Sequence, residues 1–247
     1  MVRQLLNAVL NRFVRGRRPA PTLGAAADLY QPRYSPWLDP LGFGRLYERI
    51  RPFTVVDAPR CYVLHTLARQ ARHVAGEYWE CGVYRGGTAL LLADVAAEDQ
   101  RPLRLFDTFR GMPTPDPEHD WHAAGDFSDT SATRVRQLVD YERAVLHEGA
   151  IPASFRGLES QVIALAHIDV DLHRSVLDCC SFVYPRLAAG GFMVFDDYGW
   201  PTCVGARLAV DEFFADKPEV PLVLTTGQAL VIRLSSPQSP RPTQGVL

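Results

Sequence analysis

Apolar and polar positions follow two alternating patterns through most of the chain. Short apolar runs predict strands over 76–83, 102–107, 144–149, 162–171 and 191–197, the last two of them buried. Longer segments with an apolar stripe predict helices over 88–98, 131–144, 175–187 and 206–216, the third stopped near Gly190–Gly191. A hairpin is predicted over 221–234. Because strands alternate with helices, we expect an α/β fold: a doubly wound, Rossmann-like sheet closed by an antiparallel hairpin.

The two ends of the chain have different patterns. Apolar residues at helical spacing within 2–18, interleaved with arginines, predict an amphipathic helix. We expect it to pack on the domain or on a second copy of the chain, with a membrane surface or a lid as alternatives. Residues 235–247 are rich in Pro and Ser, which predicts a flexible tail. The expected parts are an N-terminal helical or lid extension (1–60), one α/β domain (61–234) and the tail.

Composition narrows the possible partners and the compartment. The 247 residues carry a formal net charge of −2, which argues against a nucleic-acid binder. No apolar run is long enough for a membrane helix, and Asn7 and Asn11 interrupt any signal-peptide core. The five cysteines lack C-x-x-C spacing, which predicts buried free thiols in a reducing compartment. We therefore expect a cytoplasmic protein without stable membrane association.

A glycine-rich segment, "ECGVYRGGT", follows the first predicted strand. Gly82, Gly86 and Gly87 would let the backbone approach a ligand ahead of a helix N-terminus, although the segment is not G-x-G-x-x-G. Asp107 ends the next strand, where an acid typically binds the hydroxyl pair of a ribose. Together these features favour a cofactor that contains adenosine. Tight turns beside a solvated Asp107 are the alternative interpretation.

Acidic residues follow two later strands directly. Asp169 comes at the end of one predicted strand, and Asp196 and Asp197 come at the end of the next. If the two strands are neighbours, three carboxylates meet at one edge of the sheet and repel one another unless a cation neutralises them. Carboxylate oxygens select Mg²⁺, Ca²⁺ or Mn²⁺. The alternative is that each acid caps a helix or a turn.

Several of these segments together resemble one family of enzymes. "ECGVYRGGTALLLA", "LFDTFRGMP", "HIDVDLHRSVLDCCSFVYPRLAAGGFMVFDDYG" and "GARLAVDEFF" are similar to the macrocin O-methyltransferases, which include the mycinamicin and aminocoumarin sugar methyltransferases. The resemblance runs from about Tyr62 to Phe214. It implies a class I S-adenosylmethionine (SAM) fold, a Mg²⁺ ion, and methyl transfer to a sugar hydroxyl of a small glycosylated substrate.

The resemblance also assigns roles to individual residues. It implies that Glu80, Gly82 and Thr88 line the methionine side of SAM, that Asp107 binds the ribose, and that Asp169, Asp196 and Asp197 bind the metal. One departure is visible, because His173 stands where the family usually has Tyr in "D-x-D-L-Y". The long segment 111–131 is expected to be a lid or to be disordered, with Ser128 and Asp126 as further cofactor contacts.

The chemistry needs an activated hydroxyl. A neutral sugar hydroxyl is a poor nucleophile, and a cation can lower its pKa and orient it while a carboxylate takes the proton. Asp169 or Asp171 would be that base, and the sequence leaves the choice open.

Two other function classes remain open. "DVD" at 169–171 is also the D-x-D of metal-dependent glycosyltransferases, although such an enzyme needs no SAM-type glycine loop. A protein that kept the SAM fold as a non-catalytic binding module is the other alternative. For the enzyme we expect a small glycosylated molecule as substrate, no nucleic-acid partner, and a homo-oligomer.

Overall fold

The computed structural model describes residues 35–235, and residues from Trp37 onward form one compact unit. The amphipathic helix expected within 2–18 and most of the tail expected at 235–247 lie outside the described residues. Within the described part, no helix is both long enough and apolar enough to cross a membrane. All five cysteines are buried free thiols, as predicted.

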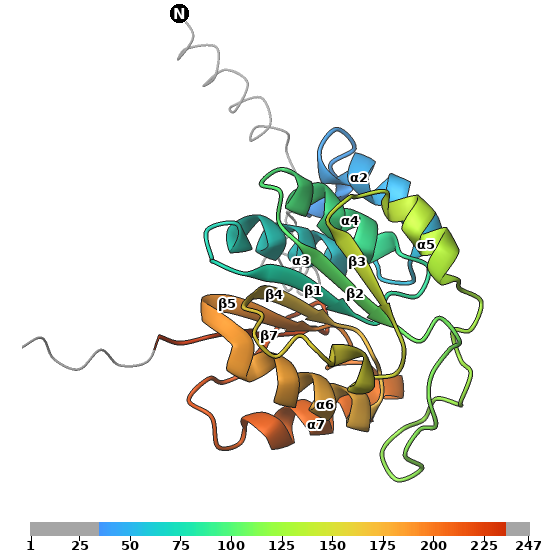
Figure 1. Ribbon diagram of the computed structural model, residues 1–247, viewed down its shortest axis with the longest axis vertical. Helices are drawn as coiled ribbons and strands as arrows, with labels where there is room; N and C mark the ends of the chain where they lie inside the picture. Colours follow the sequence, from blue (N-terminus) through green and yellow to red (C-terminus); the bar gives the residue numbers. More distant parts are fainter. Residues whose placement is uncertain (1–34, 236–247) are drawn as a thin grey trace, which may run out of the picture. The chain divides into compact units, whose positions relative to one another are not determined.

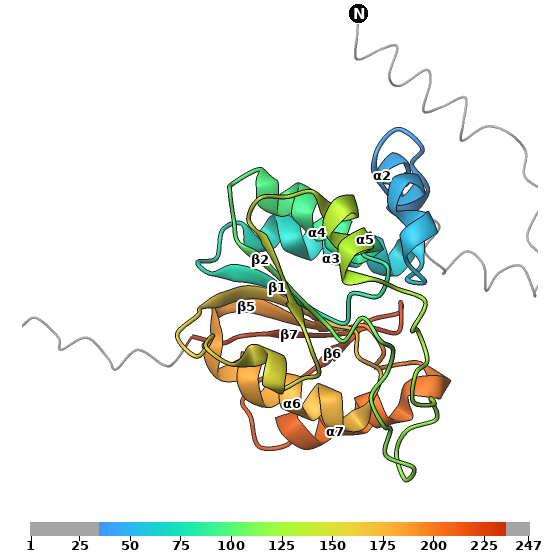
Figure 2. The same cartoon turned by 45° about the vertical axis from the view of Figure 1, so that its right-hand side comes forward.

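Seven strands form one sheet across the centre of this unit (Figures 1 and 2). The strands are β1 (Glu77–Cys81), β2 (Leu103–Asp107), β3 (Ala144–Glu148), β4 (Ile163–Ile168), β5 (Leu187–Phe195), β6 (Leu222–Val223) and β7 (Ala229–Ile232). Their order is β3-β2-β1-β4-β5-β7-β6. The first five strands are parallel, and β7 pairs antiparallel with both β5 and β6. This confirms the doubly wound sheet with a closing hairpin.

Helices cover both faces of the sheet. The helices of more than one turn are α2 (Phe43–Ile50), α3 (Ala58–Ala71), α4 (Gly87–Ala97), α5 (Ala132–Val139), α6 (His173–Val183) and α7 (Val204–Phe214). Figure 1 shows α3, α4 and α5 on one face and α6 and α7 on the other. Strand residues alternate between the two cores: Tyr78 packs into the first and Trp79 into the second. Both faces of β1 and β4, at the centre of the sheet, are therefore buried.

Helices α2 and α3 were not among the predicted elements. The Asp57 side chain caps α3 by accepting a hydrogen bond from the backbone N–H of Arg60 (3.0 Å), and Pro59 lies in the first turn. Leu64 and Ala68 of α3 are fully buried in the core on that face. Residues 37–60 therefore lie in the same compact unit as the sheet, without a break at residue 60.

The predicted end of the helix over 175–187 was wrong. Helix α6 ends at Val183, and a short 3-10 turn that contains Pro185 follows it. Proline cannot continue the helical hydrogen bonds, so the chain leaves the helix before the glycines. Gly190 and Gly191 lie inside strand β5, where the Gly190 N–H donates to the Arg233 carbonyl (2.8 Å).

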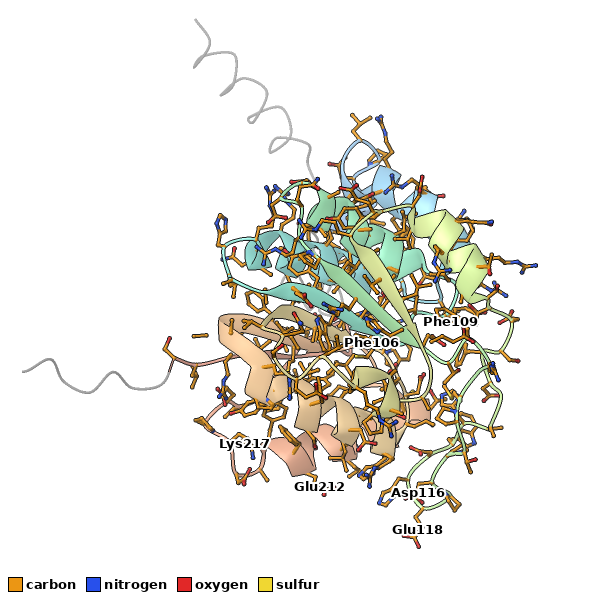
Figure 3. The ribbon with its side chains drawn as sticks, in the orientation of Figure 1. Phe106, Phe109, Asp116, Glu118, Glu212 and Lys217 are labelled. Carbon is orange, nitrogen blue, oxygen red and sulfur yellow. The ribbon has the colours of Figure 1, made fainter. Side chains whose placement is uncertain are left out.

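The long connection between β2 and α5, residues 108–131, is an ordered loop beside the carboxyl ends of the strands. Its two arms are joined by hydrogen bonds between Met112 and the backbone of Gly125 and Asp126. Farther along, the Asp120 carboxylate accepts from the backbone N–H of His173 at the start of α6 (2.8 Å). Figure 3 shows Asp116 and Glu118 at the outer tip of the loop.

Candidate active site

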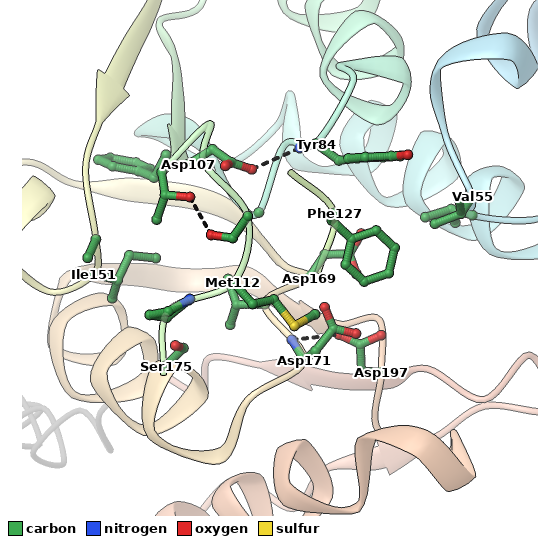
Figure 4. Close-up of a pocket in the computed structure, with 18 of the residues that line it drawn as sticks. Val55, Tyr84, Asp107, Met112, Phe127, Ile151, Asp169, Asp171, Ser175 and Asp197 are labelled. Carbon is green, nitrogen blue, oxygen red and sulfur yellow. Dashed lines mark hydrogen bonds between the residues drawn. The ribbon is translucent and has the colours of Figure 1, made fainter. Parts of the chain in front are cut away.

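A pocket lies at the carboxyl ends of the parallel strands, where doubly wound sheets bind their ligands (Figure 4). The space between its walls, including the open mouth, is about 880 Å³. Residues after β1, β2, β3, β4 and β5 all contribute to its wall, and the 108–131 loop adds Met112, Pro113 and Phe127. The segments that the sequence marked as chemically unusual therefore meet at one pocket.

Asp107 organises one half of the pocket. Its Oδ2 accepts hydrogen bonds from the backbone N–H groups of Val83 and Tyr84, both at 2.8 Å, and its Oδ1 accepts from that of Phe109 at 2.7 Å. The first two bonds fix the glycine-rich loop against the end of β2, and the third fixes the start of the 108–131 loop. A carboxylate has about four acceptor positions, so about one remains for a ligand hydroxyl. Beside it, Ile151 and Met112 supply an apolar wall.

The other expected cofactor residues differ in their positions. Gly82 lines the pocket together with Asp107, whereas Glu80 and Thr88 are buried outside its lining. Ser128 is exposed and does not line the pocket, but the preceding residue, Phe127, does. Phe127 was not among the expected cofactor contacts, because its position beside the strand ends depends on the folded path of the loop.

A buried charge network lies beside the pocket and links α3, β1, β4 and the end of β5. His167 Nδ1 lies 3.0 Å from Glu80 Oε1, and His167 Nε2 lies 3.5 Å from Asp196 Oδ1. Gln228 donates to the same Asp196 oxygen (2.8 Å), and Arg60 forms an ion pair with Oδ2. Burial alone lowers the pKa of His167, but the contacts with Asp196 and Glu80 outweigh it and raise that pKa to about 10. The imidazole is therefore a cation at neutral pH.

This network engages Asp196, whereas Asp169 and Asp197 form no ion pair with any described residue. Both Asp196 oxygens are engaged, and the nearby positive charges lower its pKa despite burial. Asp169, Asp171 and Asp197 all line the pocket (Figure 4). Burial raises the pKa of each of the three, and repulsion from the neighbouring carboxylates raises it further. A cluster of three carboxylates at one wall is the chemistry of a cation site.

Of the expected metal triad, Asp169 and Asp197 line the pocket, whereas Asp196 is fully buried and does not. Ligand atoms of His167, Asp169 and Asp196 lie within 4.8 Å of one another, and Asp197 is not a member of that group. Asp197 Oδ2 instead accepts from the backbone N–H of Asp171 (3.2 Å). Strand β4 ends at Ile168, so strand alternation does not set the relative directions of Asp169 and Asp171. A left-handed backbone (φ 55°) turns the chain at Asp171, and both acids still line the pocket.

His173, which stands where the family usually has Tyr, does not line the pocket. Its ring stacks on that of His119 with centroids 4.4 Å apart, and its Nε2 lies 3.4 Å from Glu212 Oε2. This histidine therefore joins the 108–131 loop to α6 and α7.

Replacing Arg60 is expected to destabilise the folded chain. Arg60 is only 7% exposed, pairs with buried Asp196, and lies with its guanidinium 4.6 Å from the ring centroid of Trp200. Arg60→Met keeps much of the side-chain volume but leaves Asp196 short of a counter-charge, which costs about 3–5 kcal/mol. Urea unfolding measures the loss. Arg174→Met is the matched control, because the Arg174 pair with Asp178 is on the surface. Equal unfolding free energies for both variants would contradict the network.

Known proteins were compared with this chain in sequence and in structure. Mycinamicin III 3''-O-methyltransferase from Micromonospora griseorubida is 29% identical over 157 residues, which cover 57% of this chain and 61% of the relative. A 4'-O-methyltransferase of a rhamnosyl-tetracenomycin from Streptomyces olivaceus is 29% identical over 147 residues, 53% of this chain and 56% of the relative. The chain thus matches less than two thirds of the length of these relatives.

The fold of this chain is similar to those of solved methyltransferase structures. The O-methyltransferase NovP superposes with a TM-score of 0.66 at 22% identity, covering 74% of this chain and 83% of NovP. The calicheamicin methyltransferase CalS11 gives 0.61 at 19% identity, covering 77% and 92%. These neighbours confirm the class I methyltransferase fold. The profile of the macrocin-O-methyltransferase (TylF) family matches residues 52–222, so the chain belongs to that family.

Proposed function

We propose that this protein transfers a methyl group from SAM to a sugar hydroxyl of a glycosylated natural product, with the help of Mg²⁺. The observation that carries the proposal is the division of one pocket into two halves. Asp107 and an apolar wall form one half, and the three clustered carboxylates of Asp169, Asp171 and Asp197 form the other. The printed names of the relatives, one of which specifies a rhamnosyl group, support a sugar hydroxyl as the acceptor.

The Asp107 half fits the adenosine end of SAM. Its remaining acceptor position suits a ribose hydroxyl, and Phe106, Met112 and Ile151 offer an apolar surface to a base. Gly82 lets the chain pass close to the ligand on the side toward Asp169. Glu80 and Thr88 do not line the pocket. We assign them to holding the glycine-rich loop and β1 in place.

The acidic half fits a hard cation. Asp169 and Asp197 are the proposed principal ligands, since Mg²⁺ commonly uses one or two carboxylates and fills its other positions with water and substrate. Asp196, the third expected ligand, has both oxygens engaged by Arg60, His167 and Gln228. We therefore assign Asp196 mainly to orienting the site. When bound, SAM supplies an electrophilic methyl group and Mg²⁺ lowers the pKa of a coordinated hydroxyl.

Asp169 is the better candidate for the base that takes the hydroxyl proton. Its carboxylate lines the pocket and accepts no hydrogen bond from any described residue. Asp171 Oδ1, in contrast, accepts a hydrogen bond from the Cys203 thiol (3.2 Å). A group that is already hydrogen-bonded is less free to take a proton, so we place Asp171 second.

Asp107→Asn is expected to weaken SAM binding by roughly 10- to 100-fold. The amide cannot accept from all three loop N–H groups and a ribose hydroxyl, and a bond to a charged acceptor contributes about 1.5–3 kcal/mol. Isothermal titration calorimetry with SAM measures the change. Asp211→Asn, on the outer helix α7, should leave the affinity unchanged. Wild-type affinity in Asp107→Asn would remove the ribose assignment.

The proposed reaction is tested with purified protein, SAM, Mg²⁺ and a panel of 6-deoxy-sugar glycosides, with product mass as the readout. The expected result is a gain of one methylene in at least one glycoside. A calorimetric isotherm with a nucleotide-sugar and none with SAM would indicate the glycosyltransferase alternative. SAM binding without turnover of any glycoside would favour the non-catalytic binding module.

A further inference from the structure

A second cluster of potential ligands stands at the edge of the pocket. It shares Asp171 with the acidic half but contains neither proposed Mg²⁺ ligand, Asp169 or Asp197. It consists of His122 from the 108–131 loop, Asp171 from the loop after β4, and Cys203 from the turn before α7. One ligand atom of each residue lies within 4.8 Å of the others. The imidazole, the carboxylate and the thiol therefore come from three different connections of the sheet, which follow β2, β4 and β5, and they lie close together.

The distances within this cluster match a tetrahedral coordination sphere. Cys203 Sγ lies 3.2 Å from Asp171 Oδ1 and 3.6 Å from His122 Nε2, and the latter two atoms lie 3.7 Å apart. Bond lengths of about 2.3 Å to sulfur and about 2.0 Å to nitrogen or oxygen place tetrahedral ligands about 3.3–3.6 Å apart. A cation at the centre of the cluster needs only small movements of the three side chains.

The surroundings orient the ligands toward the centre. His122 Nδ1 lies 3.3 Å from Asp126 Oδ2, and Asp126 also accepts from the backbone N–H of Ala123 (2.9 Å). A carboxylate at the remote ring nitrogen is the usual support of a metal-binding histidine, because it fixes the ring and its tautomer. The Thr202 hydroxyl lies 3.5 Å from Cys203 Sγ.

We propose that His122, Asp171 and Cys203 form a binding site for a soft divalent cation of the zinc type. A thiolate and an imidazole select such a metal over Mg²⁺, so the two sites would differ in the ion that they take. On binding, the Cys203 thiol releases its proton to solvent and the sulfur coordinates the metal. The bound ion ties the 108–131 loop to the loops after β4 and β5, and thereby holds one wall of the pocket in place.

The probe is Co²⁺, which gives a near-ultraviolet absorption band only when a thiolate is a ligand. The full chain is first freed of metals by a chelator and then titrated. We expect a band that saturates at one equivalent and disappears on addition of Zn²⁺. Cys203→Ser should abolish the band, and Cys180→Ser, which changes a buried thiol of α6, should keep it. No band in the wild type, or a band that survives in Cys203→Ser, overturns the proposal.

Two further measurements separate a metal site from a purely structural cluster. Asp126→Asn should lower the Co²⁺ affinity by roughly 10- to 100-fold, as expected for a residue that supports a ligand. Chymotrypsin cleavage after the exposed Trp121 should slow when Zn²⁺ is added to the wild type and remain unchanged in His122→Ala. Cleavage that is equally slowed by Zn²⁺ in both proteins would contradict ligation by His122.

Discussion

Asp169→Asn is expected to lower the rate of methyl transfer by about 10²–10⁴-fold, the contribution of a positioned base, while SAM affinity stays within a few-fold. Asp169 lies in the acidic half of the pocket, and Asp107 lies in the half assigned to the nucleoside. The substitution removes a carboxylate that forms no ion pair with any described residue, and burial and Asp196 already raise the pKa of this carboxyl. Single-turnover rates and SAM calorimetry on the same preparation separate the two effects.

Chelation provides an independent test of the same site. Excess EDTA should reduce wild-type turnover, and Mg²⁺ should restore it in the wild type but not in Asp169→Asn. Asp216→Asn is the control, because Asp216 is exposed and pairs with Lys217 on the surface. Full activity of the wild type in excess EDTA would contradict the metal proposal while leaving the methyl-transfer proposal intact.

The sheet could be predicted from the sequence because its strands carry a local signal. A parallel strand buried on both faces reads as a continuous apolar run, and β4 and β5 show that run followed directly by acids. Helix ends were less visible. Helix α6 ends at Val183, ahead of Pro185, although Gly190 and Gly191 are the more conspicuous breakers. Both glycines lie in strand β5, where Gly190 has a positive φ that glycine adopts easily.

The charge balance of the site could not be predicted in the same way. Arg60 is 136 residues away from Asp196 along the chain, in a helix that has no strong apolar stripe. His167 is fully buried on β4, and its two acidic neighbours are Glu80 of β1 and Asp196, just after β5. Such long-range ion pairs decide which of the adjacent carboxylates keeps a free charge. The pairs form only when the sheet has assembled.

Gly82→Ala is expected to destabilise the fold by about 2–5 kcal/mol and to abolish SAM binding. Gly82 has a φ of +87°, which costs a residue with a Cβ about 1–2 kcal/mol. An added Cβ would also lie 1.7 Å from the carbonyl oxygen of Asp169, and such overpacking costs about 1–3 kcal/mol more. Relieving this clash must push the Asp169 segment away from the glycine-rich loop, so the substitution affects both halves of the site.

Gly157→Ala separates the strain from the clash. Gly157 has nearly the same φ, +82°, but nothing lies within 4 Å of an added Cβ. Its loss of unfolding free energy, measured in urea, should therefore be the backbone cost alone, with SAM affinity unchanged. If the two alanine variants lose equal stability, the contact between Gly82 and Asp169 is not tight. A Gly82→Ala protein that binds SAM normally would mean that the glycine loop can move away from β4 without loss of the pocket. The close approach of these two strand ends would then be a feature of the fold alone rather than a requirement of the site.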